Sequence, residues 1–420
     1  MNHLEKYQIF LERTAQSRDH LIERFISVRQ WSNQICEPLE SEDFVVQPCP
    51  EVSPPKWHLG HTTWFFEEMI LSKFDSEYSR FDESLRVLFN SYYKSAGKHW
   101  LQNDRGHLSR PTVQNVFKYR EYIDEKMVSF LRSSEPSHEV DFLLELGLHH
   151  EQQHQELLMM DIKYILATNP SFPIYNKESL PKAEKMIESW DTFDEGVYEV
   201  GHSGVDFAFD NEGPCHKTYI YPFSIRKNSV SNGEYLEFIS RGGYSQPTLW
   251  LSEGWDWKNS ESIKNPLYWV KKGEDWFEYT LHGLKPLDLD APVTHISYFE
   301  ADAFANWTGH RLPTEFELET YIKSSDSNYD SDHTLNHPTS SSDKTGQVWF
   351  WTRSHYSPYP GFRTFDGTLG EYNGKFMCNQ FVLKGGCVAT PKSHYRHSYR
   401  NFFQPRQRWM FSGIRLAKDV

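Results

Sequence analysis

The chain has 420 residues, of which 38% are hydrophobic and 16% aromatic, so we expect one to three folded domains. Its 44 Lys and Arg residues against 58 Asp and Glu residues give a net charge of −14, which argues against nucleic acid as the main partner. No apolar run long enough to cross a membrane is present, and the N-terminus lacks the apolar stretch of a signal peptide. The five scattered cysteines favour a cytoplasmic protein without a disulfide framework.

The first part of the chain, residues 1–172, is predicted to be helical. Asn169-Pro170 stops the last helix, and residues 173–193 resemble a linker. Helices of this length favour an all-α four-helix bundle, a fold that often builds metal sites from inward-facing side chains. Apolar residues recur at helical spacing in residues 4–27 and near residues 60–75, 112–133 and 139–166.

Two histidines lie early in this helical part. The Pro54-Pro55 pair fits a helix start, and an apolar, aromatic-rich segment follows it. On that helix His58 and His61 sit nearly on one face. Either of them could contribute to a metal site.

A second histidine group lies in residues 149–156. On a helix, His150 and His154 project from one face, and two imidazoles at this spacing can bind one metal ion. The same run fits the short zinc-protease pattern, with Glu151 as general base, but Leu157 and Met160 replace the Gly and His of its longer form. A polar helix face without metal is the other alternative.

A third ligand must therefore come from another segment, and His58 and His61 are the candidates. Three neutral imidazoles on one side of a six-coordinate iron leave sites open for substrates and oxygen. A closed structural zinc site would favour thiolates instead.

From residue 194 to residue 420 the pattern changes. Short β-branched and aromatic runs alternate with Gly, Asn, Pro and Asp turns, and tryptophans are frequent. This pattern predicts an irregular α+β domain with long loops. Residues 324–344 are rich in Ser, Asp and Asn, which favours a surface insertion.

Several motifs together resemble a known family. Residues 53–68 and 147–161 resemble the two metal-binding helices of a DinB-like domain. The second half resembles the fold of the formylglycine-generating enzyme, also called the sulfatase-modifying-factor or C-type-lectin-like fold. The pairing of these domains, in this order, is similar to the ergothioneine-type sulfoxide synthases. The segments that resemble the second domain are residues 207–212, 230–235, 292–297, 311–315, 384–387 and 413–417.

The resemblance implies an enzyme with one non-haem Fe(II) and small-molecule substrates. Such enzymes use O2 to join a thiol to the imidazole carbon of hercynine and form a sulfoxide. The implied ligands are His61, His150 and His154, and His58 then supports the ligands or has a structural role. No prediction follows for the oligomeric state.

The resemblance also implies substrate contacts. Gln153 and Asn401 match positions that bind the substrate, and Phe402 and Phe403 could hold the trimethylammonium group with their aromatic faces. Tyr92 and Tyr93 resemble the paired tyrosines of a branch that uses free cysteine rather than γ-glutamylcysteine, and a phenol can supply a proton. The candidate partners for the carboxylate of the thiol are Arg105, Arg110 and Arg400.

Four further alternatives remain open. A selenoneine-type or an ovothiol-type synthase would use the same scaffold with a selenosugar donor or with unmethylated histidine. A formylglycine-generating oxidase needs a closely spaced cysteine pair, whereas Cys378 and Cys387 are nine positions apart. A metal-binding two-domain protein without enzymatic activity would hold structural zinc.

Overall fold

A computed structural model describes residues 18–91, 97–324, 329, 336–340, 345–365, 370–371 and 373–420. The chain divides into two compact units. Unit 1 consists of Met1–Asn169, Gly204–Phe207 and Arg363–Asn373, and unit 2 contains Pro170–Ser203, Ala208–Phe362 and Gly374–Val420. Within the described ranges, no helix is both long and apolar enough to cross a membrane.

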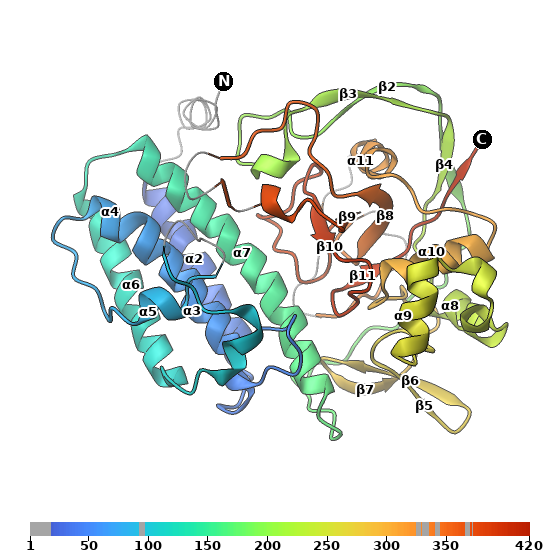
Figure 1. Cartoon of the computed structure of the whole chain (residues 1–420), viewed down its shortest axis with the longest axis horizontal. Helices are drawn as coiled ribbons and strands as arrows, with labels where there is room; N and C mark the ends of the chain where they lie inside the picture. Colours follow the sequence, from blue (N-terminus) through green and yellow to red (C-terminus); the bar gives the residue numbers. More distant parts are fainter. Residues whose placement is uncertain are drawn as a thin grey trace. The chain divides into compact units, whose positions relative to one another are not determined.

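Unit 1 is built around four long helices. They are α2 (Arg18–Cys36), α3 (Pro55–Phe66), α6 (Val113–Ser133) and α7 (His138–Ala167). The helix α3 packs against both α6 and α7, and α2 packs mainly against α7 (Figure 1). The prediction of a helical N-terminal region is confirmed.

Shorter elements connect these helices. Residues Glu67–Leu71 form a π-helix, η2, that continues α3, and such π-helical turns are frequent near functional sites. The other short helices are η1 (Asp43–Val45), α4 (Ser72–Phe74), α5 (Leu85–Leu88) and η4 (Gln102–His107).

The ends of the long helices follow from local sequence. Pro55 opens α3 in the first turn, where a missing N–H costs nothing. The side chain of Thr112 accepts a hydrogen bond from the Asn115 N–H at 3.2 Å, and Ser137 caps α7 in the same way. Every residue of α3 is buried, so this helix is central to unit 1.

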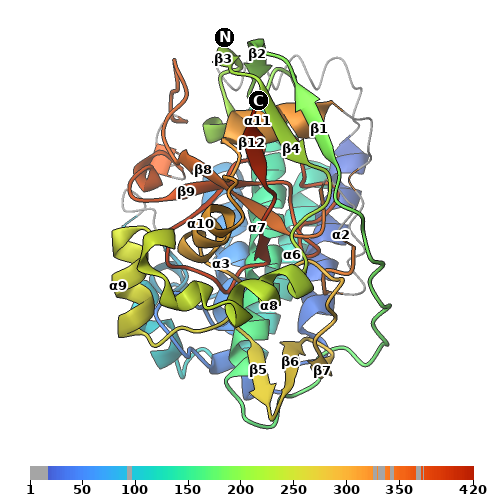
Figure 2. The same ribbon diagram turned by 90° about the vertical axis from the view of Figure 1, so that its right-hand side faces the viewer.

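Two sheets of unit 2 bring distant parts of the chain together. In the first, β4 (Phe223–Arg226) lies between β1 (Trp190–Phe193) and β12 (Ala417–Asp419), and both pairs are antiparallel (Figure 2). The strand β1 occupies the last four residues of the stretch 173–193. The second sheet has the order β10 (Asn401–Phe403), β9 (Phe381–Lys384), β8 (Trp349–His355) and β11 (Ser412–Gly413), with β11 parallel to β8.

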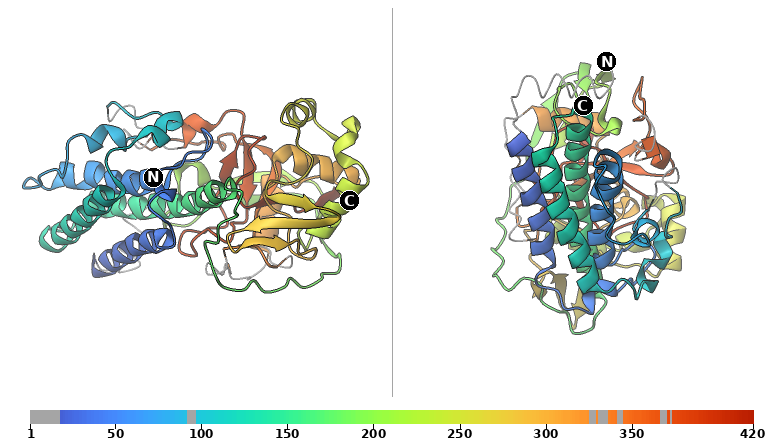
Figure 3. Two further views of the ribbon diagram at one scale, coloured as in Figure 1. Left: turned by 90° about the horizontal axis from the view of Figure 1, so that it is seen from below. Right: turned by 90° about the vertical axis from the view of Figure 1, so that its left-hand side faces the viewer.

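The two remaining sheets are local. The strands β2 (Gly196–Val200) and β3 (His216–Ile220) pair antiparallel, and β5 (Trp269–Lys272), β6 (Asp275–Thr280) and β7 (Gly283–Pro286) form an antiparallel meander (Figure 3). Strands of this length alternate with loops, as the sequence pattern predicts.

The helices of unit 2 are short. In three of them a Ser or Thr and a Glu three residues later satisfy each other's backbone N–H groups, as Ser297 and Glu300 do at the start of α10. The core of this unit gathers around Leu318, Tyr321 and Ile322 of α11. The helices are α8 (Asn232–Ser240), α9 (Ser252–Ser260), α10 (Tyr298–Trp307) and α11 (Glu315–Lys323), with short 3-10 turns at Asp210–Glu212, Gly243–Ser245, Pro247–Leu249 and Gly374–Phe376. The α+β character predicted for the second half is confirmed.

Candidate metal centre

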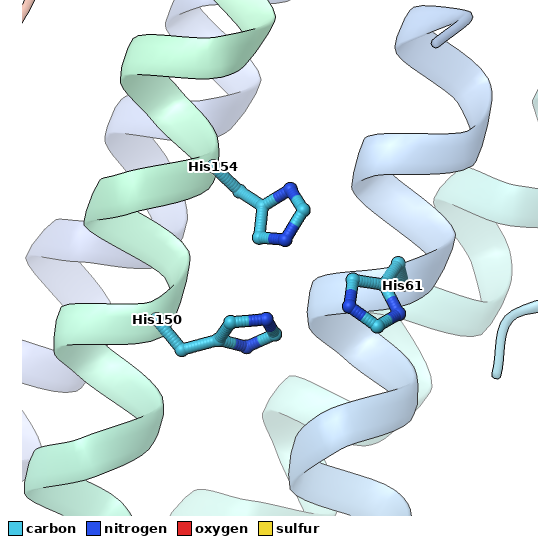
Figure 4. Close-up of side chains that lie close together, drawn as sticks. All are labelled: His61, His150 and His154. Carbon is cyan, nitrogen blue, oxygen red and sulfur yellow. The ribbon is translucent and has the colours of Figure 1, made fainter. Parts of the chain in front are cut away.

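Three histidines from two helices of unit 1 converge. His61 comes from α3, whereas His150 and His154 come from successive turns of α7 (Figure 4). One nitrogen of each ring lies within 4.8 Å of the others. Within the described part of the chain, this is the only set of three or more His, Cys, Asp or Glu side chains gathered in this way.

The three rings are held in their neutral form. Burial lowers the pKa of His61 and of His154 well below the usual value, and their mutual proximity to His150 lowers both further. Burial likewise lowers the pKa of His150 to about 3. Neutral imidazoles keep a lone pair for a metal ion, so the cluster is chemically ready to bind one.

The orientation of His61 is fixed on both sides of its ring. Its Nδ1 lies 2.6 Å from the carbonyl oxygen of Phe89, and since a carbonyl only accepts, Nδ1 carries the proton. The lone pair is therefore on Nε2. Trp57 stacks on the His61 ring with ring centroids 4.5 Å apart, and Trp64 stacks on the same ring with centroids 5.8 Å apart.

The face of α7 that carries the ligand pair also carries Gln153. Helical spacing places residues 150, 153, 154 and 157 on one side of the helix. His150 is buried, whereas Gln153, His154 and Leu157 are half-buried among fully buried neighbours. Along α7, the cluster is therefore most accessible around Gln153 and His154. Gln153 is the residue that the family resemblance assigns to substrate binding.

Glu151 does not take part in the cluster. It accepts hydrogen bonds from Arg29 Nη1 at 2.9 Å, from Ser32 Oγ at 2.6 Å and from Arg120. Burial raises the pKa of its carboxyl, but Arg120 and Arg29 outweigh this and lower the pKa to about 2. A carboxylate so acidic and so fully bonded is a poor general base, which argues against the zinc-protease alternative.

The same ion network braces the two ligand helices. Arg29 also donates to Thr63 Oγ1 at 2.9 Å, and Arg120 donates to Thr62 Oγ1 at 3.3 Å, directly beside His61. Arg29 belongs to α2 and Arg120 to α6. Side chains of all four long helices therefore meet in this network, which links α3 to α7.

The three arginines proposed as carboxylate partners have different surroundings. Arg105 is buried in unit 1, donates to Ser53 Oγ at 2.7 Å and lies 3.2 Å from the ring centroid of Trp57. Its charge contributes to the lowered pKa values of His61 and His154, so it is close to the cluster. Arg110 is exposed.

Arg400 lies in unit 2 and is already engaged there. Its Nε and Nη2 donate to the two carboxylate oxygens of Glu315 at 2.8 and 3.1 Å, and further N–H groups reach the carbonyls of Asn211 and Ser357. Four of its five N–H donors are thus used inside the fold. Arg105 is the better candidate for a substrate carboxylate.

The other predicted substrate-contact residues are distant from the three histidines in the sequence. Asn401, Phe402 and Phe403 form β10 of unit 2, where Phe402 stacks on Tyr356 at 4.0 Å and Phe403 is buried. Asn401 is half-buried and accepts from the Phe402 N–H at 2.9 Å. Tyr92 and Tyr93 lie outside the described residues.

Two features of the site escape sequence reasoning. Asp161 lies on α7 seven residues after His154, on the same face, and this spacing was the available signal. The buried Arg29 and Arg120 give no such signal, because an arginine on a helix is usually read as a surface residue.

The donor set fits an open transition-metal site. The candidate ligands are three neutral imidazoles, one of them half-buried, and none of the cysteines in the described ranges joins the cluster. Imidazole suits iron, copper, nickel and zinc, and a site with three such ligands leaves coordination positions for substrates.

Comparison with known proteins agrees with the sequence motifs. The model of the sulfatase-modifying factor enzyme 1-like domain matches residues 177–342 and 338–420. Hercynine oxygenase of Mycobacterium tuberculosis is 28% identical over 316 residues, which cover 66% of this chain and 72% of the relative. Hercynine oxygenase of Mycolicibacterium smegmatis is 29% identical over 68% of this chain and 73% of its own length.

A fungal relative extends the same pattern. Ergothioneine biosynthesis protein 1 of Schizosaccharomyces pombe is 30% identical over 234 residues, which cover 51% of this chain and 28% of the relative. These relatives confirm the resemblance that the motifs indicated. The chain belongs to the family defined by the sulfatase-modifying factor enzyme 1-like domain and is a homologue of hercynine oxygenases.

Proposed function

We propose that this protein is a non-haem Fe(II) sulfoxide synthase of ergothioneine biosynthesis. It would use O2 to join a thiol, cysteine in preference to γ-glutamylcysteine, to the imidazole carbon of hercynine. The observation that carries the proposal is the cluster of His61, His150 and His154 in a homologue of hercynine oxygenases. The helical unit that holds the cluster would be a DinB-like four-helix bundle.

His61, His150 and His154 would hold the metal. When bound, Fe(II) supplies the activation of O2 and the binding of the thiol sulfur. The chain contributes three neutral nitrogen ligands, a dry surrounding formed by Trp57 and Phe65, and one accessible side. That accessible side is where the organic substrates must enter.

Gln153 would bind the imidazole of hercynine. It is half-buried on the ligand face of α7, next to His154 in the chain. Its amide offers both a donor and an acceptor, so it can bind either nitrogen of an imidazole. Exchange for Glu or Leu should weaken binding of hercynine more than binding of the metal.

Arg105 would bind the carboxylate of the thiol substrate. Its positive charge is close enough to lower the pKa values of His61 and His154, and its stacking on Trp57 fixes the guanidinium plane. Guanidinium and carboxylate form strong, directional hydrogen bonds. Replacement of Arg105 by Lys would keep the charge and lose the stacked geometry.

Tyr92, Tyr93, Asn401 and Phe402 complete the proposed substrate contacts. The two tyrosines would supply a proton near the iron, and Asn401 with the ring of Phe402 would hold the amino-acid end and the trimethylammonium group of hercynine. If Tyr92→Phe and Tyr93→Phe both leave the ratio of sulfoxide to oxidised thiol unchanged, the proton-donor role fails.

The substrate assignment is tested by a donor and acceptor matrix. Protein loaded anaerobically with Fe(II) is supplied with O2 and either hercynine or histidine, each with cysteine, γ-glutamylcysteine or a selenosugar, and products are identified by mass. The proposal predicts the highest rate for hercynine with cysteine. A preference for histidine would indicate an ovothiol-type synthase, and a preference for the selenosugar would indicate a selenoneine-type synthase.

A further inference from the structure

His58 contacts the proposed ligand His154 through its imidazole ring. It precedes His61 by three residues on α3, and its Nδ1 is 2.9 Å from Nδ1 of His154. The two rings meet edge to face, with centroids 5.2 Å apart. On its other side, Nε2 of His58 is 2.9 Å from Oδ2 of Asp161. His58 and Asp161 are each 3% exposed, so water has little access to the bond between them.

Asp161 is itself held in place. It stands on α7 two turns after His154, and its Oδ2 also accepts the backbone N–H of Ser53 at 2.8 Å. The hydroxyl of Ser53 in turn accepts from Arg105 at 2.7 Å. Asp161 is therefore held by Ser53, and the side chain of Ser53 is bonded to Arg105.

The direction of each hydrogen bond follows from its partners. An ionised carboxylate only accepts, so Nε2 of His58 carries a proton. A His58 ring that carries this single proton offers only a lone pair at Nδ1. With that tautomer, the 2.9 Å contact between the two Nδ1 atoms is a hydrogen bond donated by Nδ1 of His154, which leaves the lone pair of His154 on Nε2.

We propose that His58 and Asp161 are positioning residues that fix the tautomer and ring orientation of His154, so that its Nε2 is presented for the metal. The inference rests on the metal centre proposed above. The pair gives His154 the same proton arrangement that the Phe89 carbonyl gives His61, so two ligands from different helices present Nε2 for different structural reasons. Partners of this kind, behind a metal-bound imidazole, typically change metal affinity about 10–100-fold.

The first test measures affinity for the metal alone. Metal-free wild type, His58→Ala, Asp161→Ala and Asp161→Asn are titrated anaerobically with Fe(II) against a competing chelator. We expect about 10–100-fold weaker binding in both alanine variants. Asp161→Asn keeps an acceptor oxygen for His58, so its affinity should lie between those of wild type and Asp161→Ala.

The matched control is His149→Ala. His149 is also buried on the same helix, but it bonds to Glu145 at 3.1 Å and stacks on Phe207, so its loss removes a buried ring while His58 and Asp161 stay in place. Its Fe(II) affinity should equal that of wild type. Unchanged affinity in His58→Ala and Asp161→Ala would overturn the inference, and so would an equal loss in the control, because general packing would then explain the effect.

The second test needs no metal and no activity. Long-range proton–nitrogen spectra of the metal-free protein with ¹⁵N-labelled histidine distinguish Nδ1–H from Nε2–H rings. Wild-type His154 should be the Nδ1–H form, and Asp161→Asn should show a mixture. A wild-type His154 protonated on Nε2 would overturn the inference. Wild type that shows Nδ1–H but binds no Fe(II) would instead contradict the proposed function.

Discussion

The exchange of Glu151 for Gln should destabilise unit 1 strongly without removing any ligand. In wild type the buried network contains two cations, Arg29 and Arg120, and two anions, Glu151 and Asp124. Arg29, Arg120 and Glu151 are each at most 1% exposed. Glutamine has nearly the same shape, so the exchange leaves the packing intact and removes one negative charge.

The magnitude follows from the charges left behind. Two ion pairs at close range are each worth about 4 kcal/mol at an effective dielectric of roughly 20, or about 8 kcal/mol together. Against this stands the desolvation of the carboxylate, which costs several kcal/mol. The loss in the free energy of unfolding should therefore be about 3–5 kcal/mol, as for other broken buried pairs.

Scanning calorimetry of the metal-free protein measures this loss. At about 2–4 °C per kcal/mol, the transition of unit 1 should fall by about 6–20 °C, whereas that of unit 2 should stay in place. The control Asp124→Asn removes a carboxylate that is 28% exposed and pairs with Arg29, and it should cost about 1 kcal/mol. A shift below about 2 °C in Glu151→Gln would refute the reasoning, because Arg29 and Arg120 would then have adequate partners without it.

Two further predictions concern acid stability and the packing behind His61. Burial raises the pKa of Glu319, but Lys384 and Lys323 outweigh burial and lower the pKa from 4.5 to about 2. The stabilising contribution of the Glu319 carboxylate is therefore present above about pH 4.5 and is lost as the pH falls toward 2. In Glu319→Gln, the urea midpoint of unit 2 should therefore start lower at pH 7 and fall less steeply between pH 5 and 2; a wild-type slope would contradict the ion pair. A Cβ at Gly60 would lie closer than 3.0 Å to the ring of Phe89, whose carbonyl orients His61. Gly60→Ala should therefore lower the free energy of unfolding by about 1–3 kcal/mol and weaken Fe(II) binding. The control Gly196→Ala, where the added Cβ meets no close neighbour, should do neither. Wild-type Fe(II) affinity in Gly60→Ala would show that the Phe89 carbonyl does not position the ligand.

The helices and the histidine pair on α7 were predictable because both depend on short-range spacing. The four-residue step from His150 to His154 places two imidazoles on one face whatever the rest of the fold does. The choice of His61 over His58 needed the family motif, because the two stand nearly on the same face of α3. In the structure, His61 joins the cluster, whereas His58 forms a hydrogen bond with His154.

The supporting residues were not predictable from spacing alone. Arg29 and Arg120 both pair with Glu151 on a third helix, and no local sequence pattern indicates a partner that is 122 or 31 positions away. The sequence likewise gives no sign that the guanidinium of Arg400 bonds to Glu315. Long-range pairing of this kind depends on the tertiary fold.

The most direct measurement compares product formation by wild type and His61→Ala after anaerobic loading with Fe(II). Both proteins receive hercynine, cysteine and ¹⁸O2, and mass spectrometry follows the sulfoxide conjugate. Wild type should form one conjugate that carries ¹⁸O in the sulfoxide, and His61→Ala should form almost none while retaining its fold. Full activity in His61→Ala, or a wild type that holds zinc and consumes no O2 with both substrates present, would contradict an open iron site built from these three histidines.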